Sequence, residues 1–360
     1  MRSSAQTEPA AGVGAPADVF RTGRAFVALS PGNYRALAHD RDERRRQVWP
    51  GEVEFIEWPR GETRLRALAR LLRTSRRYDA IVLDGSVGLR SGYADLWAAG
   101  LIGRRRGAPV VLIADATWKR GVSALDRLAC RVGIRLVDGP SVHYCVLSRD
   151  ETRIFPRTWG VAPEKLFFTP WPYTLGPGEL GATSADGPIF AGGDSLRDYG
   201  PLIEAARGVE AEIRIATRRE DVAARSDLPA NVSAGPVPHE QFIASLRSAR
   251  AVVVPLVPTL ERSAGQTTYV NAMALGKLVV VTDCLGVRDY VENGRTGLIV
   301  PPGDAAELAR ALRWATDPSN REEAERIGAR AREVARERFS PDEYVINLLR
   351  AARASHQFSS

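Results

Sequence analysis

The sequence predicts an α/β fold of two doubly wound domains, each built on a parallel sheet. Short apolar runs alternate with helical patterns through both halves of the chain, as in parallel sheets that helices cover on both faces. A segment rich in Pro and Gly, residues 170–181, breaks this periodicity near the middle. The length of 360 residues is sufficient for two domains with a hydrophobic core each.

In the N-terminal half, apolar runs predict six strands, and three segments between them have helical periodicity. The predicted helices are residues 63–74, 93–101 and 123–136. No Gly-x-Gly-x-x-Gly follows the first strand, which argues against a nicotinamide dinucleotide. The predicted strands are Ala25–Leu29, Val53–Trp58, Ala80–Asp84, Pro109–Ala114, His143–Leu147 and Leu166–Thr169.

Composition argues against several classes of protein. The chain is 44% hydrophobic and 26% charged, as is usual for globular proteins. No apolar run approaches the roughly twenty residues that span a bilayer, and the first residues lack the apolar segment of a secretory signal. The three scattered cysteines, Cys130, Cys145 and Cys284, favour neither disulfides nor a metal site, so we expect a cytoplasmic location.

The positive charge is concentrated in the N-terminal half. The net charge is +7; residues 1–180 hold 28 basic and 19 acidic side chains, whereas residues 181–360 hold 22 and 24. Arginine supplies nearly all the basic residues, a bias that is weak evidence for a nucleic-acid partner, and we expect none. Residues 63–77 place leucines on one helical face and arginines on the other. Such a helix is consistent with weak contact with an anionic membrane, although packing on a sheet with a solvated outer face is more usual.

Residues 263–304 contain the most informative pattern. A small polar approach, Ser263–Gln266, leads into a short helical pattern, Thr267–Leu275, which a glycine ends. A buried-type strand, Leu278–Thr282, follows, and Asn293-Gly294 predicts a tight turn before a further strand. A glycine-rich approach to a helix N-terminus leaves N–H groups and the positive end of the helix dipole facing outward, which suits a phosphate.

Two parts of this pattern carry a resemblance to a known family. Asn271-Ala-Met-Ala-Leu-Gly276 and Gly297-Leu-Ile-Val-Pro-Pro-Gly-Asp304 resemble the donor-binding core of retaining, nucleotide-sugar-dependent glycosyltransferases of family four, whose fold is called GT-B. The resemblance implies two Rossmann-like domains with parallel sheets that face each other across a cleft. Ser263 and Asn271 stand where family members carry acidic residues, beside the sugar and the ribose respectively.

A second resemblance lies upstream, in Pro188–Ala205, where a short strand leads through a glycine loop into a helix. Family members hold the donor diphosphate there with an arginine and a lysine; Arg197 stands at the lysine position, and Gly193 replaces the arginine. A third match, Asn231–Glu240, is the loop that passes the nucleotide base in the family. The donor-binding residues that the resemblance implies are Gly192, Gly193, Arg197, Pro236, Val237, Ser263, Ala264, Gly265, Gln266, Thr267, Thr268 and Asn271.

The composition and the resemblance together define the expected organisation of the chain. We expect a flexible tail at residues 1–22, an N-terminal acceptor-side domain at 23–170, a linker at 171–186 and a C-terminal donor-binding domain at 187–340. The last helical pattern, within residues 341–360, is expected to cross back onto the N-terminal domain, as the last helix does in GT-B folds.

The expected reaction is sugar transfer from a nucleotide diphosphate sugar, without a metal or another cofactor. Cleavage of a sugar–phosphate bond leaves positive charge on the sugar and negative charge on the diphosphate. Arg197 and the helix N-termini near Gly192 and Gly265 would stabilise the diphosphate. Family members place a histidine near the sugar, but here Asp115 or Thr117 follows the corresponding strand. We therefore predict Arg197 and Asp115 as catalytic residues, and no metal ligands.

The sequence leaves the substrates open. The acceptor is unidentified, and a small natural product, a glycan and a lipid carrier are the expected alternatives. The neutral Ser263 and Asn271 would suit a thymidine diphosphate sugar or a deoxy sugar, because a donor that lacks a hydroxyl loses least from the missing acids. His39 follows the first loop, where inverting GT-B enzymes keep a base, but its arginine-rich surroundings favour the protein surface.

The alternative function is not enzymatic. The chain could be an inactive GT-B protein that binds a nucleotide or serves as the partner subunit of another transferase. The absence of the arginine, the histidine and both acids favours this alternative, whereas Arg197 and the glycine turns favour a working phosphate site. A nucleotide-sugar epimerase would need acid and base side chains across the cleft, and the sequence offers no good candidates.

Overall fold

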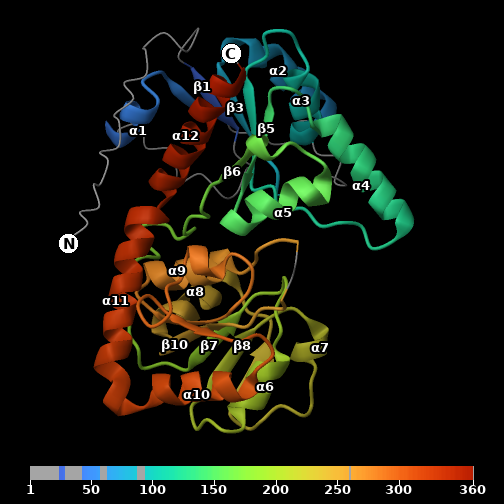
Figure 1. Cartoon of the computed structure of the whole chain (residues 1–360). Helices are drawn as coiled ribbons and strands as arrows, with labels where there is room; N and C mark the ends of the chain where they lie inside the picture. Colours follow the sequence, from blue (N-terminus) through green and yellow to red (C-terminus); the bar gives the residue numbers. More distant parts are fainter. Residues whose placement is uncertain (1–23, 29–42, 57–62, 87–93, 259–260, 360) are drawn as a thin grey trace, which may run out of the picture.

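The computed structural model of the chain describes residues 24–28, 43–56, 63–86, 94–258 and 261–359. It contains two α/β domains, one above the other in Figure 1. The predicted two-domain fold with parallel sheets is confirmed. The predicted tail at residues 1–22 and His39 lie outside the described residues.

The N-terminal domain has a sheet of six parallel strands in the order β2-β1-β3-β4-β5-β6. Each strand begins within a residue of its predicted position. The central strands β3, β4 and β5 were visible in the sequence because they are fully buried and therefore form continuous apolar runs. The strands are β1 (Ala25–Ala28), β2 (Val53–Ile56), β3 (Ala80–Asp84), β4 (Val110–Ala114), β5 (Val142–Val146) and β6 (Leu166–Phe168).

Helices cover both faces of this sheet. Alternate residues of β4 enter different cores: Leu112 packs in one, and Val111 and Ile113 pack in the other. The three predicted helices are present as α2, α3 and α4, whereas the sequence pattern did not predict α5. The helices are α1 (Glu43–Val48), α2 (Arg64–Thr74), α3 (Ala94–Gly103), α4 (Ala124–Val137) and α5 (Arg149–Trp159), with 3₁₀ turns η1 (Ser75–Arg77) and η2 (Pro163–Lys165).

The C-terminal domain has a second sheet of six parallel strands, in the order β12-β11-β10-β7-β8-β9. The strands predicted from the family-like pattern are present, and β11 has the predicted bounds. The strands are β7 (Ile189–Gly192), β8 (Ile213–Ala216), β9 (Val232–Gly235), β10 (Ala251–Val254), β11 (Leu278–Thr282) and β12 (Leu298–Val300).

Helices also flank this second sheet. The predicted helix at Thr267–Leu275 is α9, shifted by one residue, and Gly276 follows it in the left-handed conformation, with φ +71°. The elements are α6 (Gly200–Ala206), α7 (Glu220–Ala223), α8 (His239–Ser248), α9 (Gln266–Ala274), α10 (Ala305–Thr316) and α11 (Arg321–Arg338), with 3₁₀ turns η3 (Val287–Asp289) and η4 (Pro318–Asn320).

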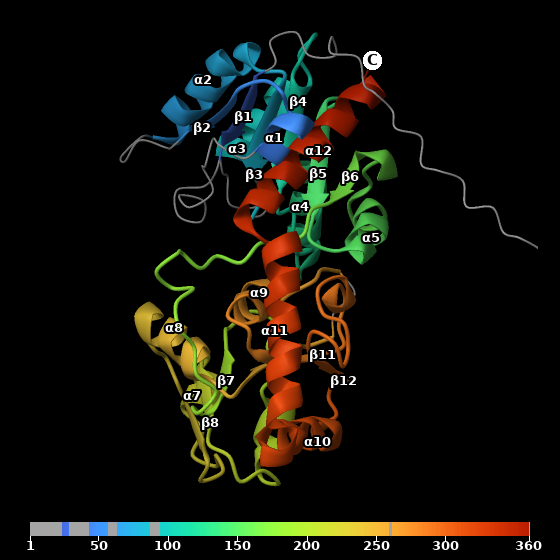
Figure 2. The same cartoon turned by 90° about the vertical axis from the view of Figure 1, so that its left-hand side faces the viewer.

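Two segments join the domains. The connection between β6 and β7 is held by the Trp171 N–H, which donates to Tyr290 Oη (2.8 Å), and by the Tyr173 N–H, which donates to the Phe339 carbonyl (2.9 Å). The last helix, α12 (Pro341–Ser359), follows α11 and contacts α1 and β4 of the N-terminal domain (Figure 2). The end of the chain therefore lies on the domain with which the chain begins.

A hydrophobic core shared by the two domains makes this arrangement compact. Leu112 of β4, Tyr269 of α9 and Leu348 of α12 belong to one connected cluster of buried side chains. Separate clusters fill the far side of each sheet. Among the described residues, no helix has the length and apolar composition needed to cross a bilayer.

Candidate functional site

The candidate site begins at the topological switch point of the C-terminal sheet. β7 and β10 are neighbours at the centre of this sheet, and the chain continues from them toward opposite edges. Ligands of open parallel sheets bind outside the carboxyl ends of the strands at such a point. The loop after β7 contains Gly193 and Arg197, and the loop after β10 contains Ser263 and Gly265. The structure therefore brings together the two segments that carry the family resemblance.

Arg197 ties these two loops together. Its Nε donates to the Gly192 carbonyl (3.1 Å), its Nη1 to the Ser195 carbonyl (2.9 Å) and its Nη2 to Thr268 Oγ1 of α9 (3.0 Å). The side chain is only 5% exposed, and burial lowers the pKa of its guanidinium. In this geometry Arg197 shapes the loop through three of the five N–H groups of its guanidinium.

Gly193 explains why the loop has room for this guanidinium. Its φ is +112°, and a Cβ at this position would lie 2.8 Å from Arg197 Nη2. A side chain at Gly192 would instead meet the ring of Phe242 at 2.4 Å. Gly193 therefore allows close packing against Arg197, and Gly192 allows close packing against Phe242, which is a structural reason for the Gly-Gly pair.

The N-terminus of α9 is an open end that faces this loop. Gly265, with φ +90°, occupies the cap position and supplies no side-chain hydrogen bond. Thr267 is exposed in the first turn, whereas Gln266 and Thr268 are buried. The first backbone N–H groups of a helix and its dipole attract an anion. This helix end is therefore the part of the site best suited to a phosphate.

Ser263 connects the site to the N-terminal domain. Its backbone N–H donates to Glu151 Oε1 (3.0 Å), and its hydroxyl donates to Glu151 Oε2 (2.9 Å). Glu151 lies in the first turn of α5 and is 2% exposed. Burial raises the pKa of its carboxyl, although hydrogen bonds from Ser263 and Ser148 oppose this shift. A carboxylate from the opposite domain thus lies at the position where family members carry their own acid.

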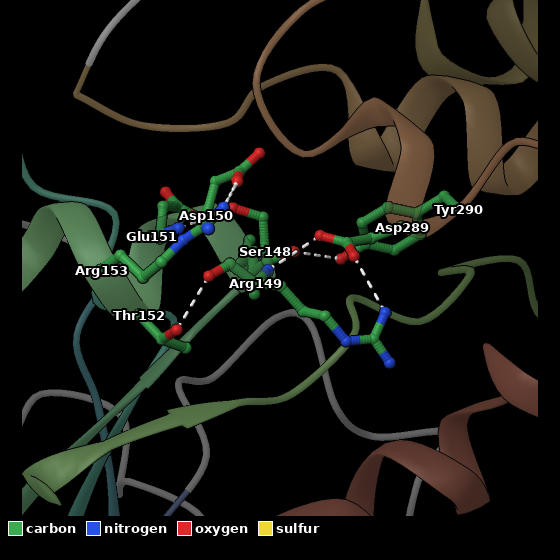
Figure 3. Close-up of polar contacts among 9 residues, drawn as sticks. Ser148, Arg149, Asp150, Glu151, Thr152, Arg153, Asp289 and Tyr290 are labelled. Atoms are coloured by element: carbon green, nitrogen blue, oxygen red, sulfur yellow. Dashed lines mark hydrogen bonds and ion pairs between the residues drawn. The ribbon is translucent and has the colours of Figure 1, made fainter.

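The start of α5 makes further contacts across the domain boundary (Figure 3). Arg149 donates to Asp289 of η3 through its backbone N–H (2.8 Å) and through Nη1 (3.0 Å). Next to this pair, Tyr290 Oη donates to the Leu147 carbonyl (2.7 Å). These contacts fix α5 against η3 and therefore hold Glu151 at Ser263.

Three buried aspartates lie near the carboxyl ends of β3 and β4 in the N-terminal domain. The Asp84 N–H donates to Asp95 Oδ2 (3.3 Å). Asp115 follows β4 with φ 54°, a left-handed conformation that is uncommon outside glycine. One oxygen of each aspartate has no hydrogen-bond partner among the described residues. Burial raises the pKa of Asp95 to about 7 and the pKa of Asp115 well above its usual value.

Arg262 brings a second cation to the site. Its Nη2 donates to Ser195 Oγ (3.0 Å) in the loop after β7. Burial lowers the pKa of its guanidinium, while the charges of Glu151 and Asp115 act in the opposite direction. The predicted catalytic residue Asp115 is thus close enough to interact electrostatically with both Arg262 and Glu151.

The remaining predicted residues are less central. Asn271 is buried; its Oδ1 accepts from the Thr174 N–H (2.7 Å), and its Nδ2 donates to Thr174 Oγ1 (3.0 Å). Its amide therefore holds the connection between the domains and is occupied in this structure. Pro236 and Val237 follow β9 at the edge of the sheet, and Ala264 is half-buried beside Ser263.

Sequence reasoning missed Glu151 and Arg262. Ser148-Arg-Asp-Glu151 has the spacing of a helix capping box, a purely local role. Ser148 does cap α5, because its hydroxyl accepts from the Glu151 N–H (3.2 Å). The second role of Glu151, at Ser263, depends on the placement of the two domains, and no signal near either residue indicates it.

The largest cavity described here lies away from this site, and the described residues hold no metal-binding cluster at it. A cavity of about 710 Å³ is lined by Arg250, Lys277 and Arg332, but Arg250 and Lys277 precede β10 and β11, at the amino edge of the sheet. Ligands bind at the carboxyl edge of such sheets. In the described part of the chain, no group of three or more His, Cys, Asp or Glu side chains is arranged to hold a metal ion.

Comparison with known proteins matches a family model to part of the C-terminal domain. Residues 194–317, which include most of the loop after β7 and all of α9, match the family model described as "Glycosyl transferases group 1". The C-terminal domain is a group 1 glycosyltransferase domain. No sequence among the curated proteins matches the chain.

Solved structures similar to this glycosyltransferase share its GT-B fold. A sucrose-phosphate synthase from Thermosynechococcus elongatus is 17% identical, with a TM-score of 0.59, over 90% of this chain and 96% of the other. HepE from Anabaena, in complex with UDP, is 16% identical, with a TM-score of 0.58, over 90% and 97%. The lipopolysaccharide outer core galactosyltransferase WaaB is 14% identical, with a TM-score of 0.56, over 91% and 98%. At these identities the likeness establishes the fold alone.

Proposed function

We propose that this glycosyltransferase moves a sugar from a nucleoside diphosphate sugar to an acceptor, with retention of anomeric configuration and without a metal ion. The observation that carries the proposal is the meeting of three segments: the loop after β7, the N-terminus of α9, and Glu151 from the opposite domain. HepE is solved with UDP and with UDP-glucose, which supports a donor of this class. Retention is inferred from the family resemblance.

The diphosphate is proposed to lie at the first turn of α9. Its negative charge grows as the bond to the sugar breaks, and preoriented N–H groups stabilise that charge without reorganising. Arg262 adds a guanidinium beside the same loop, through Ser195. Arg197 keeps the loop in shape, through the Gly192 carbonyl and Thr268.

Glu151 and Asp115 are proposed to face the sugar and the acceptor. The sugar gains positive charge in an oxocarbenium-like transition state, which a nearby carboxylate stabilises. The Glu151 carboxylate supplies this negative charge at the position where the chain itself has the neutral Ser263. The strained backbone at Asp115, with φ 54°, is typical of a residue held in place for function.

The donor is proposed to be a thymidine diphosphate sugar, which lacks one ribose hydroxyl. A ribose-binding carboxylate is absent at position 271, and the Asn271 amide is engaged with Thr174. The base would pass the edge loop at Pro236 and Val237, as the resemblance implies. The acceptor class and the cytoplasmic location remain predictions from the sequence.

A second candidate function has a specific observation in its favour. Both Arg197 and Asn271 are buried and engaged in internal hydrogen bonds. A GT-B protein that binds a nucleotide without turnover, or that serves as a partner subunit, would show the same closed arrangement. The unpartnered oxygen of Asp115 and the uncapped end of α9 favour the enzyme.

Release of free nucleotide from a donor panel tests the proposal. UDP, dTDP and GDP sugars are incubated with the purified protein, and binding of each nucleotide is followed by thermal shift. We expect release with at least one donor and a roughly tenfold or greater loss in Glu151→Gln, which keeps the size of the side chain but removes its charge.

Asp150→Asn is the matched control, since Asp150 is the neighbour of Glu151 on α5 and is more exposed. Release by the control should equal that of the wild type. Binding of a nucleotide without release from any donor would favour the inactive alternative. Absence of binding by every nucleotide and donor would overturn the proposed function.

A further inference from the structure

The cavity of about 710 Å³ on the C-terminal domain is large enough for a small molecule, because ligand pockets usually measure roughly 300–1,000 Å³. Its walls come from the connection between β6 and β7, the start of β11, the end of α10, and α11. Figure 1 shows α11 along one side of this domain, where it packs on α9. Substrates of open sheets bind at the carboxyl edge, so a ligand in this cavity, at the amino edge, would act outside the reaction.

Two glycines let α11 lie close against the end of α9 and form one wall of the cavity. A Cβ on Gly328 of α11 would lie 2.2 Å from the Gly276 carbonyl oxygen, and a Cβ on Gly276 would lie 2.7 Å from Arg332 Nε. Arg332 Nη2 donates to the Leu275 carbonyl at the end of α9 (2.7 Å). This close packing fixes the guanidinium of Arg332 at the wall of the cavity.

Lys277 places a second cation at the same wall. It is only 4% exposed, and its ammonium donates to the Ser184 carbonyl and to the Ala249 carbonyl (3.1 Å). Burial and, next, the charge of Arg332 lower the pKa of Lys277 to about 8, although the charge of Asp186 opposes them. The two cations are therefore close enough to repel each other, and an anion beside both would relieve this repulsion.

Both cations retain donors for a ligand. Arg332 Nε is buried and has no hydrogen-bond partner among the described residues. An unpaired buried donor of a charged group costs stability, so this N–H calls for an acceptor that the described side chains do not supply. The ammonium of Lys277 has three N–H groups and uses two of them on the carbonyls.

Two further arginines line the cavity and have no partners of their own. They are Arg250, which precedes β10, and Arg336 of α11. Within the described ranges of the chain, neither guanidinium makes a hydrogen bond or an ion pair. A half-buried arginine without a carboxylate is available to an anionic ligand, and Arg250 is such a residue.

Most of the acids that line the cavity are already engaged. Asp186 and Glu325 both pair with Arg321, at 3.3 Å and 3.1 Å. The Asp317 carboxylate accepts from the Ser319 N–H and hydroxyl at the start of η4. The fourth acid, Glu333, is exposed. The cations of the cavity therefore outnumber the acids that could neutralise them.

We propose that this cavity binds the phosphate group of a small molecule, held by Arg250, Lys277 and Arg332, with Arg336 adding positive charge. A phosphate ester carries a charge of about −1.5 to −2 and has three acceptor oxygens, which suits three cations better than a carboxylate does. Guanidinium groups bind phosphate oxygens in pairs, and an ammonium adds a compact charge. The inference rests on the packing and charges of the C-terminal domain and does not depend on the reaction proposed above.

Helix α9 relates the cavity to the candidate site. Arg332 contacts the carbonyl of Leu275 at the C-terminal end of this helix, whereas Gly265 caps its N-terminus beside the loop after β7. A phosphate bound to Arg332 would therefore lie at one end of the helix whose other end is the proposed diphosphate site.

Titration calorimetry with the full-length protein tests the cavity. The probes are inorganic phosphate, glycerol 3-phosphate, and glycerol, which has the same organic part without the charge. We expect both phosphates to bind and glycerol not to bind. The double variant Arg250→Gln, Arg336→Gln should weaken the binding of both phosphates roughly tenfold or more, because it removes charged hydrogen-bond donors. Neither arginine has an internal partner, so the variant should unfold in urea like the wild type.

Two controls separate the cavity from other anion sites. The double variant Arg326→Gln, Arg330→Gln removes two charges of α11 that do not line the cavity, and it should bind phosphate like the wild type. Arg262→Gln removes the cation proposed for the donor site, and it should leave binding in the cavity unchanged. The proposal is overturned if neither phosphate binds the wild type, or if both double variants bind equally well. It is also overturned if only Arg262→Gln weakens binding, because the phosphate would then occupy the donor site.

Discussion

Gly286 decides how closely the two domains approach at the candidate site. A Cβ at this position would lie 2.6 Å from Ser148 Cβ and 2.9 Å from Ser263 Cβ, and its φ is +80°. Real Cβ atoms do not approach other atoms this closely, so only glycine fits between the two serines. Three small residues from three separate segments therefore let Glu151 reach Ser263.

Gly286→Ala should loosen this contact. We expect a loss of about 2–4 kcal/mol in the free energy of unfolding, from overpacking and from the left-handed backbone together. Gly294→Ala is the control, because Gly294 has φ +74° but a Cβ added there would have no atom within 4 Å. The control should lose only about 1–2 kcal/mol. Equal losses in chemical unfolding would contradict the close contact.

Asp95 should make stability depend on pH. The folded protein keeps a proton on Asp95 between the ordinary pKa of 3.8 and the raised pKa of about 7. Its contribution to stability is therefore fully present below the ordinary pKa and is lost as pH rises through about 7. Asp95→Asn carries no charge at any pH, so its stability relative to wild type should rise by about 2 kcal/mol from about pH 5 to about pH 8.

Urea unfolding at the two pH values measures this difference for Asp95→Asn. Asp150→Asn, at a more exposed position on α5, is the comparison and should follow the pH dependence of the wild type. If Asp95→Asn also follows the wild type, then Asp95 is ionised in the folded protein, and the raised pKa is wrong.

At the scale of elements, α9 and the loop after β7 form one unit. The Arg197 guanidinium joins them through Thr268, and the Arg197 carbonyl accepts from Arg219. A hydrogen bond between a buried cation and a hydroxyl contributes more than a neutral one, and leaving the donor unpaired is costly. The shape of the proposed phosphate site thus depends on a contact between two elements that are far apart in the sequence.

Thr268→Val should weaken this unit. Valine keeps the branched shape of threonine but removes the acceptor of Arg197 Nη2, so we expect a loss of about 1–3 kcal/mol in stability. Thr267→Val, at the exposed neighbouring position, should change stability by less than about 0.5 kcal/mol. Thermal and chemical unfolding compare the two variants. An equal effect at both positions would show that the hydrogen bond contributes nothing.

At the scale of the whole molecule, α12 connects the domains. It continues from α11 of the C-terminal domain and packs on α1 and β4 of the N-terminal domain. Its side chains Tyr344, Val345 and Leu348 are buried in the core that both domains share. The two domains therefore stabilise each other, and a substitution that loosens α12 should lower the stability of both.

Leu348→Ala tests this coupling. Leu348 is fully buried, and truncation of a buried leucine costs about 2–5 kcal/mol, from lost burial and from the cavity that remains. Asn347→Ala, the preceding position on α12, should cost less than about 1 kcal/mol. Calorimetry should show an unfolding transition at a lower temperature for Leu348→Ala but not for Asn347→Ala. A transition unchanged from wild type would contradict the packing of α12.

The sequence was sufficient where a role is local in the chain. Runs such as Ala80–Asp84 and Leu278–Thr282 are buried on both faces, so their strands are visible as apolar segments with the observed bounds. The helix N-terminus at Gly265 is likewise predicted by consecutive residues of the chain. Helix α5 escaped prediction, because Pro156 and a high charge content obscure its pattern.

The residues that act across the domains could not be predicted in this way. Glu151 and Ser263 are 112 positions apart, and Thr174 and Asn271 are 97 apart. Each pair exists only because α5, η3, the connection and α12 set one domain against the other. Local patterns such as Ser-x-x-Glu record only the helix cap, since capping and interdomain contact use the same residue types.

The sequence by itself determined the two parallel sheets, the glycosyltransferase resemblance and the open helix end at Gly265, because each depends on neighbouring residues. Tertiary structure alone decided which carboxylate meets Ser263, which groups the guanidinium of Arg197 contacts, and which leucines of α4 remain exposed. These depend on distances between distant segments, and the packing of two domains sets those distances.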